Sequence, residues 1–436
     1  MGVKNINKII GKYSHYVPLK NYQNKRIGVD ARNWMYRFLR SPAYSHHKYP
    51  ILKGFVNQIN TFAKYNISPI YVFDGKASEE KLDTLQKRKN QHDSVVSRIE
   101  LYKQELERRG VTLDADSILE MINDNDDVDV SVEDIINAID GEGNIDLSKI
   151  IEDDNGDVEG DGDGDGDGEG EGEGEEGDDD FKHMTAEDIQ NKIESLTTQT
   201  LVPTYKDTDL CKRLFAFTGV KYISAQGEAD EVLGMLYKKH EVDAILSADM
   251  DLLAYGVSHL LTDLKSASKG GGAVCKEYIL SDILSDFKWS HEQFVDFCLL
   301  CGCDYIDRIP WLGCKTAKKY IDTHLTVENV VTDIKKKKKG RIRLEDEETQ
   351  NYMDKVIKSR RIFSLAQLDQ REKQEESGEK NEGGIEKYSD EDKTTFFITY
   401  DLPKHVPYVC EPPPSRKKPK VAKKDKNQQS IANFFQ

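Results

Sequence analysis

The short apolar run Ala244–Leu246 constrains the fold most, because it leads directly into two acidic residues, Asp249 and Asp251. The run has the length and the composition of a buried β-strand. Two other strand-like runs also end in an acidic residue, Asp30 and Asp74. Open α/β sheets bind their ligands at the carboxyl ends of the strands. We therefore expect an α/β fold with a largely parallel central sheet, flanking helices and an acidic site at one edge of the sheet.

Three further acidic residues extend this set: Glu228 and Asp230 open a predicted helix, and Asp304 follows another. Any one of these acids, taken alone, is equally well explained as a turn former or a helix N-cap. As a set without matching Lys or Arg residues they repel one another, so they are stable together only around cations. Hard oxygen ligands in that number suit Mg²⁺ or Mn²⁺. Two such ions are the arrangement that hydrolyses phosphodiesters, which indicates nucleic acid as the substrate.

Six short motifs surround these acids. They are Met1-Gly-Val, Val29-Asp-Ala-Arg-Asn-Trp-Met-Tyr-Arg-Phe38, Val72-Phe-Asp-Gly-Lys76, Gly227-Glu-Ala-Asp-Glu231, Asp249-Met-Asp251 and Gly302-Cys-Asp-Tyr305. Together they resemble the motifs of the flap endonucleases, within the structure-specific 5′ nucleases. The resemblance covers residues 1–110, 200–325 and the last eight residues. It implies a 5′ nuclease, or PIN-like, fold with a helical arch and a helix–two-turn–helix element.

The resemblance also implies a metal site with two Mg²⁺ ions, for which Mn²⁺ can substitute. The implied ligands are Asp30, Asp74, Glu228, Asp230, Asp249, Asp251 and Asp304. Asp230 stands where the family usually has a second Glu. Its carboxylate is one methylene shorter, so we expect it to act through water.

Four other positions gain a role from the resemblance. Lys81 and Arg88 lie on one face of a predicted basic helix and match the cations that the family places beside the scissile phosphate. Fixed positive charge there would stabilise the charge that develops on the phosphoryl oxygens. Tyr36 matches a residue that stacks on a base, although an aromatic residue at this spacing is also typical of a core. Gly2 is expected near the active site, in contact with DNA.

A later segment resembles the hairpin of the helix–two-turn–helix element, which holds duplex DNA by its backbone. Gly313, Lys315 and Thr316 fit the family pattern and are the implied DNA contacts. Trp311 stands where a Gly is usual and Cys314 where a Pro is usual. Backbone groups at such a turn can bind a phosphate or a monovalent ion. The Trp argues against the ion, whereas Lys315 still suits a phosphate.

The net charge of −17 is concentrated in one segment. Residues 152–180 hold seventeen Asp and Glu and no Lys or Arg, and residues 114–151 hold twelve more acids against one Lys. Without them the chain is basic, as expected of a protein that binds nucleic acid. We predict that residues 111–200 form an acidic, largely disordered insertion. Two roles stay open for it: competition with DNA for a basic channel, or an inert solvated loop.

Cysteine usage and hydropathy indicate where such a chain works. The seven cysteines are scattered and no apolar run is long enough to span a membrane, so we expect a soluble protein in a reducing compartment. Its expected place is the nucleus of a cellular host or the replication site of a virus. Cys298, Cys301, Cys303 and Cys314 are either buried thiols, which we favour, or irregularly spaced zinc ligands.

The end of the chain carries a candidate partner site. Gln428, Ile431, Phe434 and Phe435 match the sliding-clamp box that the family carries at the same end. On one helical turn the three apolar side chains form a plug with no core to join, which favours a partner groove. The alternative is that the segment folds back on its own domain.

These features divide the chain into five predicted parts. They are the amino-terminal part of the nuclease domain with the arch base (1–110), the insertion (111–200), the internal part with the helix–two-turn–helix (201–325), a divergent part (326–410) and a basic disordered tail (411–436). We expect a monomer that cleaves branched DNA at the base of a 5′ flap during replication and repair. A 5′→3′ exonuclease acting on nicks, gaps or RNA, and a non-catalytic clamp-bound scaffold, stay open. A phosphatase is disfavoured, because Arg32 stands where its second acid would be needed.

Overall fold

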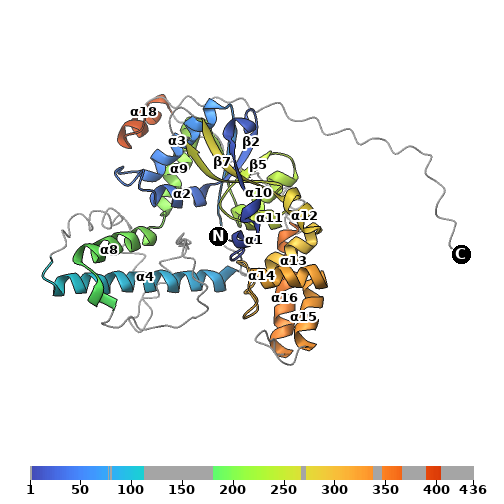
Figure 1. The fold of residues 1–436 in the computed structure, drawn as a ribbon. Helices are drawn as coiled ribbons and strands as arrows, with labels where there is room; N and C mark the ends of the chain where they lie inside the picture. Colours follow the sequence, from blue (N-terminus) through green and yellow to red (C-terminus); the bar gives the residue numbers. More distant parts are fainter. Residues whose placement is uncertain are drawn as a thin grey trace, which may run out of the picture.

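The computed structural model describes residues 2–76, 78, 81–111, 180–266, 272–336, 346–365 and 389–403. Within these ranges the central sheet has seven strands in the order β1-β7-β6-β5-β2-β3-β4 (Figure 1). The strands are β1 (His15–Pro18), β2 (Arg26–Asp30), β3 (Ser68–Phe73), β4 (Lys221–Ser224), β5 (Ala244–Leu246), β6 (His259–Ser266) and β7 (Ala273–Ile279). Strands β6, β5, β2, β3 and β4 are parallel, and β7 and β1 add an antiparallel edge. The predicted fold class is therefore confirmed.

Helices cover both faces of this sheet. They are α1 (Asn7–Ile10), α2 (Ala31–Leu39), α3 (Pro50–Lys64), α4 (Leu82–Arg108), α8 (Ala186–Thr200), α9 (Tyr205–Thr218), α10 (Ala229–Lys238), α11 (Asp251–Ala254), α12 (Leu280–Phe287), α13 (His291–Cys301), α14 (Cys314–His324), α15 (Val327–Lys336), α16 (Asp346–Phe363) and α18 (Asp390–Thr399). Short 3₁₀ turns lie at Gly11–Tyr13, Leu19–Tyr22 and Asp180–His183.

Alternation along the strands sorts the core into two layers. Val72 and Ile245 belong to one apolar cluster with α10, α11 and α13, whereas Tyr71 and Leu246 belong to the other with α2, α3 and α9. Successive strand side chains point to opposite faces, so a fully apolar strand such as β5 needs helices on both sides. This burial fixes the strand register and, with it, the position of every residue that follows a strand end.

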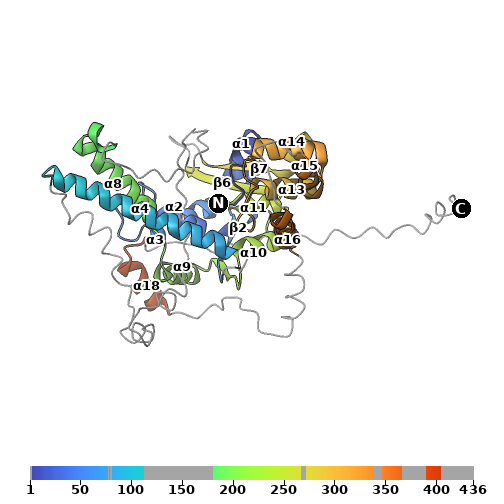
Figure 2. The ribbon, with the colours of Figure 1, turned by 90° about the horizontal axis from the view of Figure 1, so that it is seen from below.

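Helices α4 and α8 pack side by side and project from the sheet, away from α15 and α16 (Figures 1 and 2). The pair has an apolar cluster of its own, made by Ile99, Tyr102, Leu106, Ile189, Ile193 and Leu196. Arg109, beyond the end of α4, donates to the carbonyl oxygens of Phe181 (2.6 Å) and Met184 (2.7 Å), which lead into α8. The two segments on either side of the acidic tract are therefore held together.

Helix α8 corrects the predicted boundary of the insertion. Residues 186–200 were expected to belong to a largely disordered segment, but they form a helix that begins with a capping box between Thr185 and Asp188. The cap satisfies amides at the helix start, and Ile189 and Ile193 give the helix an apolar face to bury on α4. The acidic residues 112–179 lie outside the described residues.

Several other expectations also fall outside the described part of the chain. These are the basic tail 411–436 and the clamp-box residues Gln428, Ile431, Phe434 and Phe435. The divergent part 326–410 contributes α15, α16 and α18, and α18 packs on α9, where the ring centroids of Phe396 and Phe217 lie 4.9 Å apart. No helix of the described residues is long and apolar enough to cross a membrane.

Candidate active site

The acidic residues gather where the parallel strands end. Asp30 is the last residue of β2 and caps α2, accepting a hydrogen bond from the Asn33 amide at 3.0 Å. Asp74 follows β3 and accepts from the Ala229 amide at 2.8 Å, which ties it to the first turn of α10. The N-cap interpretation therefore holds for Asp30, yet the capping carboxylate also lies at the shared edge of the sheet.

Strand β5 delivers the central pair. Asp249 follows β5 and its Oδ1 accepts from the amide of Asp251, the first residue of α11, at 2.8 Å. Glu228 is the N-cap residue of α10. Of the acids predicted as ligands, Asp30, Glu228, Asp249, Asp251 and Asp304 are buried, Asp230 is half-buried and Asp74 is exposed.

Burial and mutual repulsion perturb these carboxylates. Burial, followed by the charge of Asp74, raises the pKa of Asp30 to about 7. Burial, with Asp304 nearby, raises the pKa of Asp249 to about 6. Burial and then the charge of Asp249 raise the pKa of both Asp230 and Asp251. Among the described residues, the buried Oδ1 atoms of Asp230 and Asp251 have no hydrogen-bond partner. These acids therefore destabilise one another unless a positive charge joins them.

Two basic side chains supply part of that charge. The Lys81 ammonium lies 2.7 Å from Glu228 Oε2 and 3.2 Å from Asp304 Oδ2, and Arg88 Nη2 lies 2.7 Å from Asp304 Oδ1. Burial alone would raise the pKa of Asp304, but Lys81 and Arg88 outweigh it and hold the pKa below its usual value. The expectation that the acids lack matching basic residues is therefore wrong for Glu228 and Asp304. The sequence could not reveal the pairing, because it depends on how α4 docks.

The position of Lys81 also affects whether the carboxylates can bind a metal ion in this conformation. No three His, Cys, Asp or Glu side chains of the described residues are placed to hold a metal ion together. Lys81 lies between two of the predicted ligands. The donor set itself fits a hard cation, because it offers carboxylate oxygens, two of them buried without a partner.

Gly2 lies directly against the central pair. A Cβ atom added to Gly2 would lie 2.1 Å from Asp249 Oδ1 and 2.6 Å from Asp251 Oδ1, and its φ is +81°. The Lys4 amide donates to the Gly302 carbonyl at 2.9 Å, and the Cys314 thiol donates to the Lys4 carbonyl. The amino-terminal segment is therefore part of the site wall.

Known proteins share this arrangement of segments. Family models described as XPG N-terminal domain and XPG I-region match residues 1–95 and 219–304, and these two ranges contain all seven predicted ligands, Lys81 and Arg88. The chain is 25% identical to flap endonuclease 1-A of Sorghum bicolor over 354 residues, which is 77% of this chain and 70% of the relative. It is 36% identical to flap endonuclease 1 of Osmerus mordax over 145 residues, covering 33% and 38% of the two chains. The comparisons therefore support a structure-specific 5′ nuclease of the flap endonuclease family.

This 5′ nuclease is also similar to a viral relative and to solved structures. It is 27% identical to the probable RAD2-like endonuclease 076L of Invertebrate iridescent virus 3, over 76% of this chain and 82% of the relative. The catalytic core of Rad2 in complex with DNA substrate shares 16% identity with a TM-score of 0.46, covering 82% and 80% of the two chains. Flap endonuclease-1 from Methanococcus jannaschii shares 16% identity with a TM-score of 0.44, covering 83% and 84%.

Tyr36 of this 5′ nuclease is buried in α2. The guanidinium of Arg40 lies 4.7 Å from the centre of its ring and that of Arg32 lies 5.8 Å away. In this conformation Tyr36 is a buried aromatic residue, which is the second of the two interpretations that the sequence left open. Base stacking by Tyr36 stays a prediction.

The predicted duplex-binding turn precedes α14. Gly313 is the N-cap residue of α14. Lys315 and Thr316 lie in the first turn of this helix, and the Lys315 side chain is exposed. Trp311 is half-exposed and adopts a left-handed φ of 65°, a conformation that favours the Gly usual in the family. A hydrogen bond with Cys301, and then the charges of Arg308 and Lys8, lower the pKa of Cys314. Positive charge therefore lies close to this turn.

The four clustered thiols lie behind the turn. Cys298, Cys301, Cys303 and Cys314 are free and buried, and Cys301 is hydrogen-bonded to Cys314. Buried free thiols behave as small apolar side chains, which agrees with the buried-thiol interpretation that the sequence favoured.

Three residues that support the site were not singled out from the sequence. The Ser247 hydroxyl donates to Asp30 Oδ2 at 2.9 Å, and Ser78 and Tyr305 donate to the two oxygens of Glu228 at 3.0 and 2.6 Å. Tyr305 lies within a family motif and Ser247 next to β5. Their closeness in sequence to Asp304 and Asp249 was the signal that could have identified Tyr305 and Ser247. The hydrogen bonds themselves depend on the tertiary structure.

Proposed function

We propose that this 5′ nuclease hydrolyses a phosphodiester at the base of a 5′ flap, where single-stranded and double-stranded DNA meet, and that it acts in replication and repair. The observation that carries the proposal is the position of α4. This helix starts next to Lys81, which contacts Glu228 and Asp304, and runs outward along α8. The acidic site therefore lies at the base of a helical pair that suits a single strand arriving from one side.

We propose Mg²⁺ as the cofactor, in two copies, with Mn²⁺ as a substitute. The holders would be Asp30, Asp74, Glu228, Asp230, Asp249, Asp251 and Asp304. The partnerless oxygens of Asp230 and Asp251 and the raised pKa values of four acids support this, because a cation relieves both defects. When bound, such metals activate a water molecule and neutralise charge on the phosphoryl oxygens.

The chain's own residues would orient the DNA. Lys81 is the N-cap residue of α4, Arg88 lies in the second turn of that helix, and Thr84 between them donates to the Asp304 carbonyl at 2.9 Å. Both cations are thereby held at the acidic edge, where a phosphate diester would meet them. Preorganised positive charge in a buried site stabilises developing negative charge without reorganisation.

The test is Mg²⁺-dependent cleavage of three matched labelled substrates: a 5′ flap, a nicked duplex and a 3′ flap. We expect a cut at the base of the 5′ flap, none of the 3′ flap, and loss of cutting with EDTA or on changing Asp249 to Ala. Stepwise release from the nick with little flap cutting would favour the exonuclease alternative. No cleavage of any substrate would contradict the proposal and favour a clamp-bound scaffold.

Duplex binding at the α14 turn gives a second expected result. Trp34 and Trp289 are buried, so among the chain's three Trp residues Trp311 is the exposed one. We expect duplex DNA, but not single-stranded DNA, to protect the intrinsic fluorescence from acrylamide in EDTA. Changing Lys315 to Ala should reduce the salt dependence of duplex binding by about one phosphate contact. If bound duplex DNA leaves the acrylamide quenching unchanged, the duplex does not contact the turn before α14.

We further propose a sliding clamp as partner, bound by Gln428, Ile431, Phe434 and Phe435. The apolar spacing of these residues supports it, and binding of a peptide of residues 428–436 to a sliding clamp tests it. A monomeric state, and a place in the nucleus or at a viral replication site, are proposed from the family resemblance. Sedimentation and fluorescent tagging would test those two proposals.

A further inference from the structure

The Glu228 carboxylate is held by three groups from distant parts of the chain. Ser78 donates to its Oε1 at 3.0 Å, whereas its Oε2 accepts from both the Lys81 ammonium at 2.7 Å and the Tyr305 hydroxyl at 2.6 Å. Glu228 makes no side-chain cap to its own helix. Its side chain is therefore oriented by these partners and not by α10.

The two donors on Oε2 differ in how they are anchored. Lys81 immediately precedes α4, the helix that runs outward with α8. Tyr305 is buried in the main core, and its hydroxyl lies 2.9 Å from that of Tyr255. The ring of Phe363, in α16, packs edge-on against both, with centroids 5.6 Å from Tyr305 and 5.0 Å from Tyr255. Tyr305 is thus the donor whose place does not depend on the outward helix.

We infer that Tyr305 is a positioning residue of the nuclease site, which holds Glu228 toward the other acids when Lys81 turns to a DNA phosphate. The inference rests on the proposed function, in which Lys81 contacts the substrate and Glu228 a divalent cation. A carboxylate that loses its ammonium partner inside a buried site needs another donor to keep its orientation. The Tyr305 hydroxyl is already in place for this.

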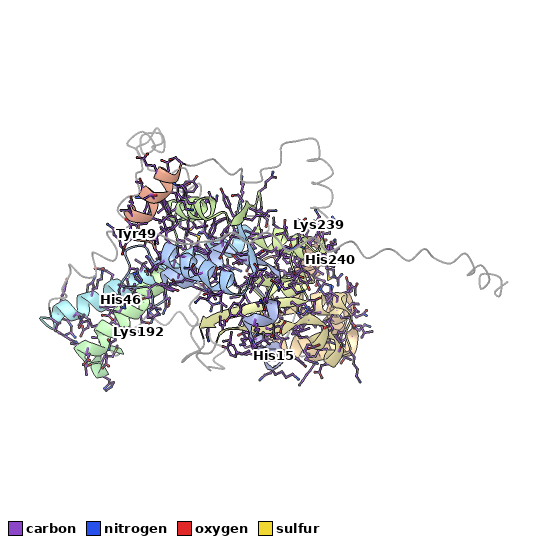
Figure 3. All side chains as sticks on the ribbon, turned by 90° about the horizontal axis from the view of Figure 1, so that it is seen from above. His15, His46, Tyr49, Lys192, Lys239 and His240 are labelled. Carbon is purple, nitrogen blue, oxygen red and sulfur yellow. The ribbon has the colours of Figure 1, made fainter. Side chains whose placement is uncertain are left out.

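Tyr255 provides a matched control. It contacts the Tyr305 hydroxyl and lines a cavity of about 310 Å³ together with Tyr237, His240, His291 and Phe363. His240, labelled in Figure 3, lies just beyond the carboxyl end of α10, whereas Glu228 precedes the other end of that helix. Changing Tyr255 to Phe therefore removes a hydroxyl from the same pair without touching Glu228.

The experiment compares Mn²⁺ binding, measured by electron paramagnetic resonance without DNA, for wild type, Tyr305→Phe and Tyr255→Phe. Loss of an outer hydrogen bond to a metal ligand typically costs ten- to a hundredfold in affinity, so we expect about a tenfold weaker Kd for Tyr305→Phe and about a twofold change for Tyr255→Phe. The affinity for the flap substrate in EDTA should stay unchanged for both variants. In a Glu228→Gln background, Tyr305→Phe should not weaken Mn²⁺ binding any further.

Two results would overturn the inference. One is a Tyr305→Phe protein that binds Mn²⁺ as wild type does. The other is an equal loss in both Phe variants, which would assign the effect to packing. If Tyr305→Phe melts well below wild type, the Glu228→Gln background distinguishes packing from positioning. A packing defect would weaken Mn²⁺ binding in that background too, whereas a positioning defect would not. Wild type that neither cuts DNA nor binds Mn²⁺ would instead refute the proposed function.

Discussion

Changing Asp249 to Asn is expected to remove flap cleavage and, at the same time, to stabilise the metal-free protein. The activity should fall by about 10³-fold, because a ligand charge at a catalytic metal site is worth several kcal/mol to the transition state. The fold should survive, since the Asn side-chain oxygen can still accept the hydrogen bond that Asp249 Oδ1 receives from the Asp251 amide.

The stabilisation follows from the perturbed carboxyl. Burial, together with Asp304, raises the pKa of Asp249 from its ordinary 3.8 to about 6. Between these values the folded state binds a proton that the unfolded state has lost, so stability falls as pH rises through this window. Above it the folded protein carries the full cost of the buried charge, which Asn does not have. We expect Asp249→Asn to gain about 1–3 kcal/mol at pH 8 and about half of that at pH 5.

Thermal melting in EDTA at pH 5 and pH 8 measures this effect. Asp243→Asn is the control with the opposite sign, because Asp243 accepts from the Arg26 amide at 3.0 Å and its Oδ1 lies 3.4 Å from the Lys25 ammonium. Its substitution should destabilise the protein at pH 8. If Asp249→Asn lowers the melting temperature at pH 8, the carboxylate is not strained in the metal-free state, and the argument for a cation there loses its main support.

Changing Gly2 to Ala is expected to give the second large loss. The added Cβ would lie 2.1 Å from Asp249 Oδ1 and 2.6 Å from Asp251 Oδ1, so either the two carboxylates or the amino-terminal segment must move. A displacement of about 1 Å at a catalytic group costs on the order of 10²-fold in rate. We expect a loss of kcat of that size, with a weaker Kd for Mn²⁺ and little change in DNA affinity.

Gly11 is the matched control for Gly2, because it lies nearby in the chain and a Cβ there would have no atom within 4 Å. Gly11→Ala should cleave the 5′ flap at the wild-type rate. Steady-state kinetics on the flap substrate, combined with Mn²⁺ titration, separates the two variants. Wild-type kcat for Gly2→Ala would mean that the amino-terminal segment moves aside without disturbing Asp249 and Asp251.

Local patterns in the sequence were sufficient for three central strands of the sheet and for the convergence of the acids, but not for the antiparallel edge of β7 and β1. The strand predicted at 244–246 is β5 with the same bounds, and the runs that end in Asp30 and Asp74 are β2 and β3. Strand length, apolar burial and the shared edge of parallel strands follow from short-range chemistry and a two-residue period. The motif resemblance pointed to the same family that the comparisons support.

Contacts between distant segments were decided by the tertiary structure alone. The pairing of Lys81 with Glu228 and Asp304 depends on where α4 docks, and the hydrogen bond from Tyr305 to Glu228 joins residues 77 positions apart. Helix α8 was missed because the acidic tract before it dominates the composition, although its cap and its apolar face on α4 stabilise it. Periodicity and capping are local and can be read from neighbours in the chain. Charge compensation in a buried site depends on which side chains the packed helices bring together, and only the folded chain determines that.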